Sequence, residues 1–316
     1  MSQGGQCLAP ARLDARTRRA YLARMRIPPG LEAFARRVTL PRSGTKLFLY
    51  DTGASGAPAI VLVHGLGDEA DTWRGVIPGL AGLWRVIAPD LPGFGRSPLP
   101  GRRLTPRFLS SLLLELLESL QLPRVVFGGS SLGAALVQLT AIVRPSAVEA
   151  LILVDGGLLV RSRVPPSLLA MLLPGIGERR YRRLAKDPGA AYASLLPYYA
   201  RLDLLPDAEQ KFLRERVGER VASDSQRRAY FSVFRSYFGW RLLHGGSAAL
   251  RARELGSPTT YIWGSKDRII PLSAAHAVRV LQPDAGLAVI DDAGHLPHQE
   301  RPEEFLRAVD RAHRML

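Results

Sequence analysis

The most regular feature of the chain is a short aliphatic run that ends in a glycine-rich or aspartate-containing turn. This unit occurs at residues 59–63, 85–88, 124–127 and 150–154, and it returns at 259–263 and 287–290. The runs are apolar at consecutive positions and do not alternate with polar residues, which is typical of parallel strands buried on both faces. The pattern therefore predicts a mostly parallel, buried sheet.

Helical patterns lie between these runs. They cover Pro106–Leu120, Leu132–Val143, Leu272–Leu281 and Pro302–Met315. Alternation of strand and helix predicts a doubly wound α/β fold with right-handed crossovers. Two further runs, Val38–Leu40 and Leu47–Tyr50, flank Ser43-Gly44 and predict an antiparallel lead-in to the sheet.

The alternation stops between residues 158 and 255, where helical patterns occur without a strand pattern. We interpret this segment as a helical cap inserted after the sixth strand, above the carboxyl edge of the sheet, where open α/β folds bind ligands. The predicted domains are a basic N-terminal arm (1–37), an α/β body (38–157 and 256–316) and the cap (158–255).

Charge divides the chain in the same places. Of 316 residues, 47% are hydrophobic and 22% are charged, which indicates a globular protein, and the formal net charge is +15. Residues 1–37 hold eight Arg and two acidic residues, residues 157–256 hold 18 Lys or Arg and nine acidic residues, and the remainder is neutral. Any function should account for two basic segments beside a neutral body.

The single cysteine, Cys7, excludes a disulfide framework and a cysteine-based metal site, and it fits a reducing compartment. Residues 1–30 lack the apolar core of a secretory signal, although their arginine-rich composition leaves an organelle transit peptide as an alternative. The apolar stretch Leu158–Leu173 is too charged to span a bilayer. These features predict a cytoplasmic protein, with peripheral membrane contact as an extension.

A candidate nucleophile lies in Gly129-Ser130-Ser131-Leu132-Gly133, between a predicted strand and a predicted helix. The spacing Gly-x-Ser-x-Gly centres on Ser131, because centring on Ser130 would require glycine at position 132. Glycines on both sides permit the sharp strand-to-helix turn that exposes a serine hydroxyl above a sheet.

A serine hydroxyl needs a base, and the base needs a carboxylate. His295 follows the last predicted strand and is the candidate base, with His298 as its rival. Asp267 follows the preceding strand and is the candidate carboxylate, with Asp155 as the alternative. Ser131, Asp267 and His295 occur in the order typical of Ser-Asp-His hydrolases of this architecture.

The first parallel strand ends in His64-Gly65-Leu66-Gly67. Small residues there allow backbone N–H groups to face a developing oxyanion. We expect the backbone N–H groups of Leu66 and Leu132 to form the oxyanion hole, and we expect His64 to orient the loop. There is no Cys/His cluster and no phosphate-binding Gly-x-x-x-x-Gly-Lys-Ser/Thr motif, so no metal and no cofactor are expected.

These motifs together resemble the α/β-hydrolase superfamily of esterases, lipases and C–C hydrolases. The matching segments are His64-Gly65, Asp90–Ser97, Gly129–Gly133, Trp263–Asp267 with Pro271, and Gly294-His295 with Glu300, Pro302 and Phe305. The resemblance covers residues 38–316 apart from the cap. Serine at the turn separates the chain from epoxide hydrolases and haloalkane dehalogenases, which resemble one another in having aspartate there. Many relatives have histidine where this chain has Ser130, so no named subfamily is assigned.

The basic cap has three interpretations. Its apolar faces pack on the sheet as a simple lid, or the lid lines an acyl pocket and rests on an anionic membrane surface. The third interpretation, nucleic-acid binding, lacks a recognised motif, and we expect no nucleic-acid partner. The sequence does not indicate an oligomeric state.

The function predicted from the sequence is cofactor-independent serine hydrolysis of a small-molecule carboxylic ester with an apolar acyl group, such as a lipid ester. Ser131 would attack, His295 would transfer the proton, and Asp267 would orient His295. The alternatives are a C–C bond hydrolase or a haloperoxidase-like enzyme using the same triad, and a non-catalytic binding or scaffold protein on a hydrolase fold.

Overall fold

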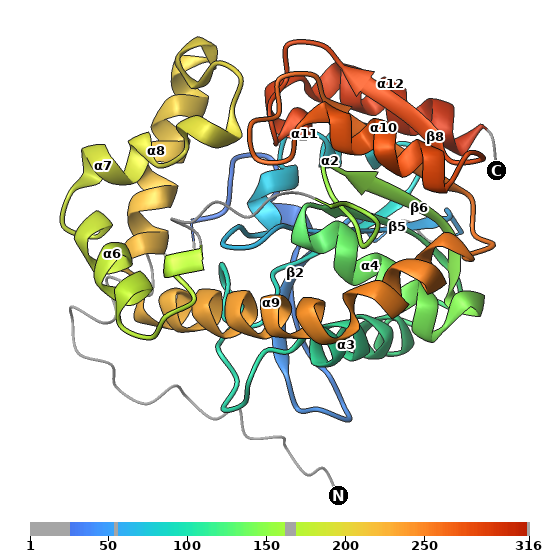
Figure 1. Cartoon of the computed structure of the whole chain (residues 1–316), viewed down its shortest axis with the longest axis horizontal. Coiled ribbons are helices and arrows are strands. Elements are labelled where there is room, and N and C mark those ends of the chain that lie inside the picture. The colour runs from blue at the N-terminus through green and yellow to red at the C-terminus, as the bar shows by residue number, and fades with distance from the viewer. Residues whose placement is uncertain (1–25, 54–55, 162–168, 315–316) are drawn as a thin grey trace, which may run out of the picture.

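Eight strands form one sheet at the centre of the molecule, as Figure 1 shows. The computed structural model describes residues 26–53, 56–161 and 169–314. The strands are β1 (Ala35–Thr39), β2 (Lys46–Asp51), β3 (Ala59–Val63), β4 (Arg85–Pro89), β5 (Val125–Ser130), β6 (Val148–Val154), β7 (Thr259–Gly264) and β8 (Gly286–Ile290). Their spatial order is β1-β2-β4-β3-β5-β6-β7-β8. Six neighbouring strands of this order, β4, β3, β5, β6, β7 and β8, are parallel to one another. Strand β2 is antiparallel to both of its neighbours, β4 and β1.

The helices occupy the intervals between the strands. They are α2 (Ile77–Leu80), α3 (Pro106–Ser119), α4 (Leu132–Val143), α6 (Ile176–Leu184), α7 (Pro188–Ala193), α8 (Asp207–Ala222), α9 (Asp224–Arg253), α10 (Leu272–Leu281), α11 (Pro297–Glu300) and α12 (Pro302–His313). Short 3₁₀ turns are η1 (Glu32–Phe34), η2 (Ala70–Trp73), η3 (Pro145–Ala147), η4 (Leu196–Tyr198) and η5 (Leu202–Leu204). The predicted doubly wound α/β fold is confirmed.

The lead-in to the sheet begins earlier than the sequence predicted. β1 starts at Ala35, inside the segment predicted as the arm (1–37), and it pairs with β2 along its whole length. The prediction was late because charged Arg36 and Arg37 lie on an exposed edge strand, where an apolar pattern is not required. Residues 1–25 of the predicted arm lie outside the described residues.

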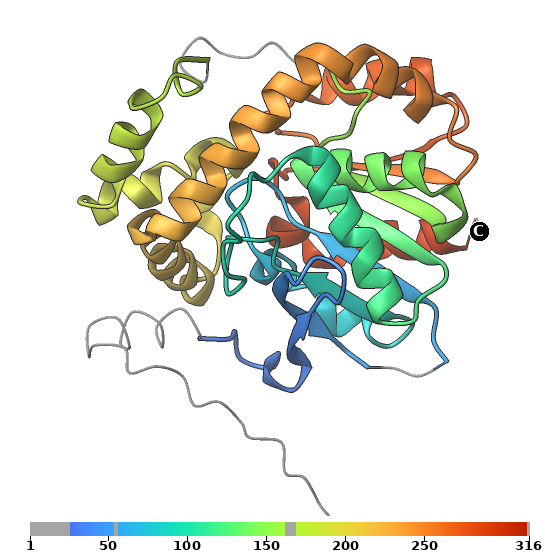
Figure 2. The ribbon, with the colours of Figure 1, turned by 90° about the horizontal axis from the view of Figure 1, so that it is seen from below.

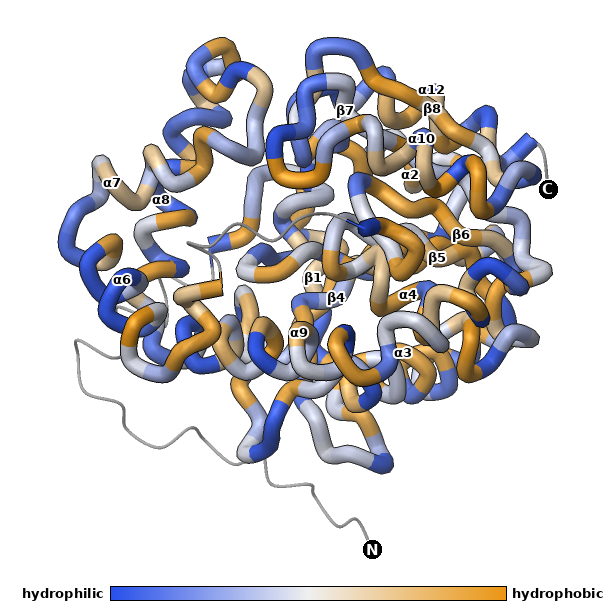
Figure 3. The backbone as a smooth tube through the Cα atoms, in the orientation of Figure 1, coloured by the Kyte–Doolittle hydropathy of each residue, from blue (hydrophilic) through white to orange (hydrophobic). Residues whose placement is uncertain are grey.

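Two apolar layers cover the two faces of the sheet. In β3, Ala59, Val61 and Val63 belong to the layer formed with α3, α4, α9 and α10. The intervening Ile60 and Leu62 belong to the layer formed with η2, α2 and α12. Successive side chains of a strand point to opposite faces, so a strand covered on both faces must be apolar throughout. Figure 3 shows this concentration of hydrophobic residues along the central strands.

Helices α6 to α9 form the part of the chain between β6 and β7, where the cap was predicted. They have small apolar clusters of their own, one of which contains Tyr181, Val217 and Phe231. The long helix α9 extends from this group across the body, and in Figure 2 it crosses above α3 and α4. None of the described helices, including α9, combines the length and the apolar character needed to span a bilayer. The cap boundaries at 158 and 255 remain predictions.

Buried arginines join α8 to the body. Arg216 lies 2.8 Å from Asp71 and 3.0 Å from Glu69, and it is 5% exposed. Arg220 lies 2.5 Å from Asp68. From the body side, Arg96 donates two hydrogen bonds to the same Asp71 carboxylate, at 2.9 and 2.8 Å. Breaking a buried ion pair leaves an uncompensated charge, so these ion pairs tie α8 to the loop after β3.

Replacing Gly133 by alanine should destabilise the fold strongly. A Cβ at Gly133 would overlap the carbonyl oxygen of Val63, which is backbone and cannot move aside. We expect the free energy of unfolding to fall by about 3 kcal/mol or more in urea denaturation. The matched control is Gly218→Ala on α8, where a Cβ meets no atom within 4 Å. This control should raise the free energy of unfolding by up to about 1 kcal/mol, and equal stabilities of the two variants would contradict the close approach of α4 to β3.

Candidate active site

Ser131 occupies the single-residue turn between β5 and α4. β5 ends at Ser130, α4 begins at Leu132, and Ser131 has φ 54° and ψ −112°. A positive φ is costly for a residue with a side chain, and such strain is concentrated at functional sites. The turn forms because Gly129 has no Cβ: a Cβ there would lie 2.5 Å from the backbone of Gly133.

Two further glycines bring neighbouring loops against Ser131. A Cβ on Gly156, just after β6, would lie 2.6 Å from the carbonyl oxygen of Ser131, and one on Gly65, after β3, would lie 3.4 Å from the Ser131 Cβ. Three strand ends therefore meet at this residue. The sequence singled out Gly65, but it did not identify Gly156 as a contact of the serine.

His295 and Asp267 meet across the ends of β8 and β7. The His295 Nδ1 lies 2.8 Å from Asp267 Oδ2, and both side chains are buried. The other carboxylate oxygen, Oδ1, accepts hydrogen bonds from the N–H groups of Ile269 and Ile270 at 2.7 and 2.9 Å. These bonds fix the carboxylate, and the carboxylate in turn fixes the imidazole with its Nε2 as the nitrogen available to accept a proton.

Asp155 lies close to this pair as a second buried acid. Its carboxyl has an oxygen within 4.8 Å of ligand atoms of both Asp267 and His295. Asp155 Oδ1 accepts the N–H of Gly264 at 3.0 Å, whereas no donor among the described residues reaches its buried Oδ2. Burial raises the pKa of Asp155 well above its usual value, and the neighbouring Asp267 carboxylate raises it further. Asp155 therefore keeps its proton to a higher pH than an exposed aspartate does.

No hydrogen bond joins Ser131 to His295 in this structure. Neither the Ser131 Oγ nor the His295 Nε2 is bonded to another described residue. The Asp155-Gly156 turn contacts both residues. Gly156 packs against Ser131, and the Asp155 carboxyl lies beside His295. Hydrogen bonds of this kind are often long without substrate and shorten in the complex.

Two backbone N–H groups beside Ser131 have no acceptor. Those of Leu66 and Leu132 donate to no described residue. Leu132 is the first residue of α4, so its N–H has no partner within the helix and lies at the positive end of the helix dipole. An oxygen placed between these two donors would be stabilised when it becomes negative.

The other histidines of the region have structural surroundings. His64 is fully buried, and its Nε2 accepts the N–H of Leu91 at 2.9 Å, while Nδ1 lies 2.8 Å from the Gly65 carbonyl. It therefore orients the loop after β3. His298, the rival base, lies 2.9 Å from the Thr72 hydroxyl, and burial lowers its pKa to about 3. A histidine with so low a pKa is a weak base, so His298 is poorly suited to accept a proton near neutral pH.

Glu300 has a role that the sequence did not indicate. Its two carboxylate oxygens accept the N–H groups of Gly294 and Ala200 at 2.6 and 2.7 Å. The His295 N–H donates to the carbonyl of Tyr198 at 2.8 Å. The loop that carries His295 is thus bound to a segment of the cap region, and only the three-dimensional structure reveals this pairing.

Aromatic side chains from the same region cover the site. The Tyr198 ring lies 5.9 Å from the His295 ring, and a Cβ on Gly67 would lie 3.2 Å from the ring of Tyr230 on α9. Arg220, the basic residue beside the loop after β3, is already paired with Asp68 and Glu69. Tyr198 and Tyr230 therefore bring aromatic surface to the loops that carry His295 and Gly67.

Asp155, Asp267 and His295 also form a group whose ligand atoms are close enough for a metal ion. However, the His295–Asp267 separation is that of a hydrogen bond, and an ion would have to replace the proton shared between these atoms. The donor set therefore fits a hydrogen-bonded histidine–carboxylate pair with a second buried acid beside it.

Comparison with known proteins agrees with this geometry. A family model described as alpha/beta hydrolase fold matches residues 58–302. A 2-hydroxy-6-oxononadienedioate/2-hydroxy-6-oxononatrienedioate hydrolase of Pseudomonas putida is 30% identical over 269 residues, which cover 82% of this chain and 89% of the relative.

Solved structures share the fold at lower identity. A 2-hydroxy-6-oxo-6-phenylhexa-2,4-dienoate hydrolase from a Rhodococcus strain superposes with a TM-score of 0.74 at 22% identity, covering 89% of this chain and 98% of that one. A membrane phospholipase A described as a bacterial virulence factor superposes with a TM-score of 0.69 at 22% identity, covering 95% and 89%. On the family match and on the relative from Pseudomonas putida, this chain belongs to the α/β-hydrolase fold family.

Proposed function

We propose that this α/β hydrolase is a serine carboxylic-ester hydrolase that acts on apolar acyl esters without a cofactor. The observation that carries the proposal is the buried hydrogen bond between His295 and Asp267, located beside a serine with positive φ at a strand-to-helix turn. A binding or scaffold protein on this fold would not need a strained serine next to an oriented, buried base.

The proposed reaction has two halves. Ser131 Oγ attacks the ester carbonyl while His295 Nε2 takes its proton, and the carbonyl oxygen becomes negative between the Leu66 and Leu132 N–H groups. His295 then gives the proton to the departing alcohol, leaving an acyl-enzyme. A water molecule, deprotonated by the same nitrogen, attacks the acyl-enzyme, and the acid leaves as Ser131 regains its proton. Asp267 stabilises the imidazolium in both halves.

The apolar acyl preference rests on the residues around the serine. Tyr230 and Tyr198 supply aromatic surface, Leu132 is buried beside the nucleophile, and Arg220 is neutralised by two acids. Such a site favours an alkyl or aryl chain over a charged one because it offers few groups that could solvate a charge.

C–C bond hydrolysis is the second candidate, because the Pseudomonas putida relative at 30% identity is named for that activity. Substrates of that type carry carboxylates, which the proposed apolar site would not solvate. Hydrolysis rates for p-nitrophenyl esters from acetyl to dodecanoyl, measured beside those for a 2-hydroxy-6-oxo-dienoate, separate the two. Faster turnover of medium or long acyl esters supports the ester proposal, and exclusive turnover of the dienoate contradicts it.

Ser131→Ala should abolish covalent labelling by a fluorophosphonate probe, since the activated hydroxyl is the group that reacts. Ester hydrolysis should fall by a factor on the order of 10³ or more. Ser130→Ala is the matched control: the neighbouring hydroxyl is buried and has no partner among the described residues, so its loss should leave labelling and folding intact. Labelling of Ser131→Ala at the native rate would exclude this nucleophile.

Asp155→Asn should retain most activity, whereas Asp155→Ala should lose at least about tenfold. Asparagine keeps an oxygen for the Gly264 N–H and provides an N–H donor toward Asp267, but alanine provides neither. Asp267→Asn should lose activity by a factor on the order of 10³ to 10⁴, because it disturbs the tautomer of His295. Steady-state ester hydrolysis by the three purified variants measures these effects. A larger loss in Asp155→Asn than in Asp267→Asn would make Asp155 the residue that orients His295.

The free energy of unfolding should vary less with pH in the Asp155→Asn variant than in the native protein. The raised pKa of Asp155 means that the folded protein binds this proton above about pH 4, where the unfolded chain has released it. Its contribution to the free energy of unfolding is therefore largest at low pH and falls by up to about 1.4 kcal/mol for each pH unit until the folded carboxyl ionises. Urea denaturation from pH 5 to 8 should show Asp155→Asn gaining stability relative to the native protein as pH rises, and a constant difference would contradict a protonated Asp155.

A further inference from the structure

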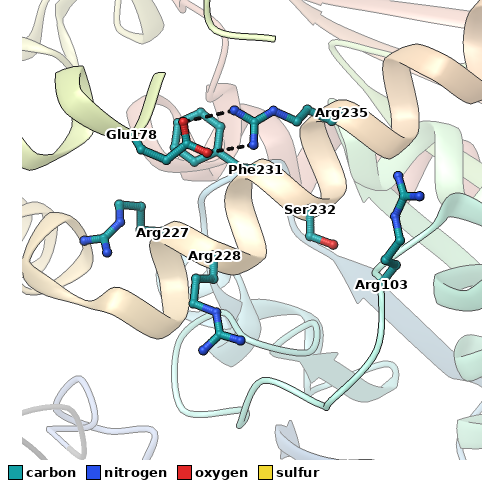
Figure 4. A pocket seen from close by; sticks show the side chains of 7 residues that line it. All are labelled: Arg103, Glu178, Arg227, Arg228, Phe231, Ser232 and Arg235. Atoms are coloured by element: carbon teal, nitrogen blue, oxygen red, sulfur yellow. Dashed lines mark hydrogen bonds and ion pairs between the residues drawn. The ribbon is translucent and has the colours of Figure 1, made fainter. Parts of the chain in front are cut away.

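The structure contains a basic pocket on the outer side of α9, separate from the candidate active site. Its volume is about 340 Å³. Four arginines line it, from α9 and from the loop before α3: Arg103, Arg227, Arg228 and Arg235. The remaining lining residues are Glu178, Phe231 and Ser232. Figure 4 shows Arg228 and Arg103 on either side of Ser232, with their guanidinium groups pointing in different directions.

The charges of the pocket do not balance. Glu178 is neutralised by Arg235, whose two terminal nitrogens lie 2.7 and 3.0 Å from its carboxylate oxygens. Arg227 pairs at 2.5 Å with Asp224, whose side chain is 79% exposed and therefore weakly held. Neither Arg103 nor Arg228 forms an ion pair or hydrogen bond with another described residue. At least two positive charges around the pocket therefore have no counter-charge within residues 26–53, 56–161 and 169–314.

The pocket also has the means to position a ligand. The Ser232 Oγ accepts the N–H of Leu104 at 2.9 Å, which ties the Arg103 loop to α9 and leaves the hydroxyl proton free to donate. The Arg235 guanidinium is 4.9 Å from the centre of the Phe231 ring and donates to the Leu172 carbonyl at 2.9 Å. These contacts fix Ser232 and Arg235, whereas the side chains of Arg103 and Arg228 are bonded to no described residue.

We propose that this pocket binds a phosphate group through Arg103 and Arg228, with Arg227 and the Ser232 hydroxyl as additional donors. A phosphate group offers several oxygens and up to two negative charges, so it can accept hydrogen bonds from guanidinium groups on two different elements. A carboxylate has one charge and two oxygens, and it therefore matches the two unpaired arginines less well than a phosphate group does.

The phosphate group has two possible sources, a soluble phosphate ester and a lipid headgroup. Leu169, Leu173 and Ile176 are 46%, 55% and 47% exposed, and they lie on the segment that leads into Glu178 on α6. Exposed apolar side chains next to a phosphate site would suit an anionic phospholipid, because acyl chains and headgroup lie together at a membrane surface. Either source would occupy the same arginines.

Calorimetric titration of the full-length protein with inorganic phosphate at constant ionic strength tests the site. We expect a dissociation constant of about 1 mM or below for the native protein. In the Arg103→Gln/Arg228→Gln variant the affinity should fall by about tenfold or more. The matched control, Arg279→Gln/Arg311→Gln, removes two exposed arginines from α10 and α12 and should change the affinity by less than about twofold. Equal losses in both variants, or no binding by the native protein, would overturn the proposal.

Two further arms identify the source of the phosphate group. The first is titration with glycerol 3-phosphate, and the second is co-sedimentation with phosphatidylglycerol or phosphatidylcholine vesicles in the presence and absence of free phosphate. Displacement from phosphatidylglycerol vesicles by free phosphate, lost in Arg103→Gln/Arg228→Gln, assigns the headgroup. Binding of glycerol 3-phosphate without vesicle binding assigns a soluble ligand. Because both arms measure binding, they remain informative in the Ser131→Ala variant, and failure of the esterase proposal would not affect them.

Discussion

Backbone segments meet at Ser131 more closely than side chains would permit, and the rest of the site depends on this approach. Gly129 and Gly133 allow β5 to turn into α4 within one residue, and Gly156 allows the loop after β6 to press against Ser131. Close packing of this kind resists deformation, so the positive φ of the serine is maintained by its surroundings. Among the described residues the N–H groups of Leu66 and Leu132 have no acceptor, and we propose that they face the substrate oxygen beside the Ser131 hydroxyl.

Electrostatics at the site follows from burial. The His295–Asp267 pair is almost inaccessible to water, and two adjacent ionised carboxylates would be very costly there. The raised pKa of Asp155 reduces this cost, because the carboxyl keeps its proton to a higher pH than an exposed aspartate does. The proposed catalytic step creates an imidazolium at His295, and the raised pKa of Asp155 disfavours a second negative charge beside Asp267.

The arginines of the cap illustrate how similar residues take different roles. Arg216 and Arg220 are buried against acids of the body and hold α8 in place. Arg235 is divided between Glu178 and backbone carbonyls, whereas Arg228 and the nearby Arg103 are exposed and have no counter-charge among the described residues. A basic segment is therefore not a uniform basic surface, and only its unpaired members are available to an anionic ligand.

The sequence by itself determined the sheet and the positions of its loops. Apolar runs at consecutive positions identify buried strands, and parallel strands end at the same edge, so Ser131, Asp267 and His295 could be expected to lie close together. Tertiary structure alone decided the raised pKa of Asp155, the attachment of the His295 loop by Glu300, and which arginines are paired. These properties depend on contacts between residues far apart in the chain and on the exclusion of water around them. A local sequence pattern contains information on neither the contacts nor the burial.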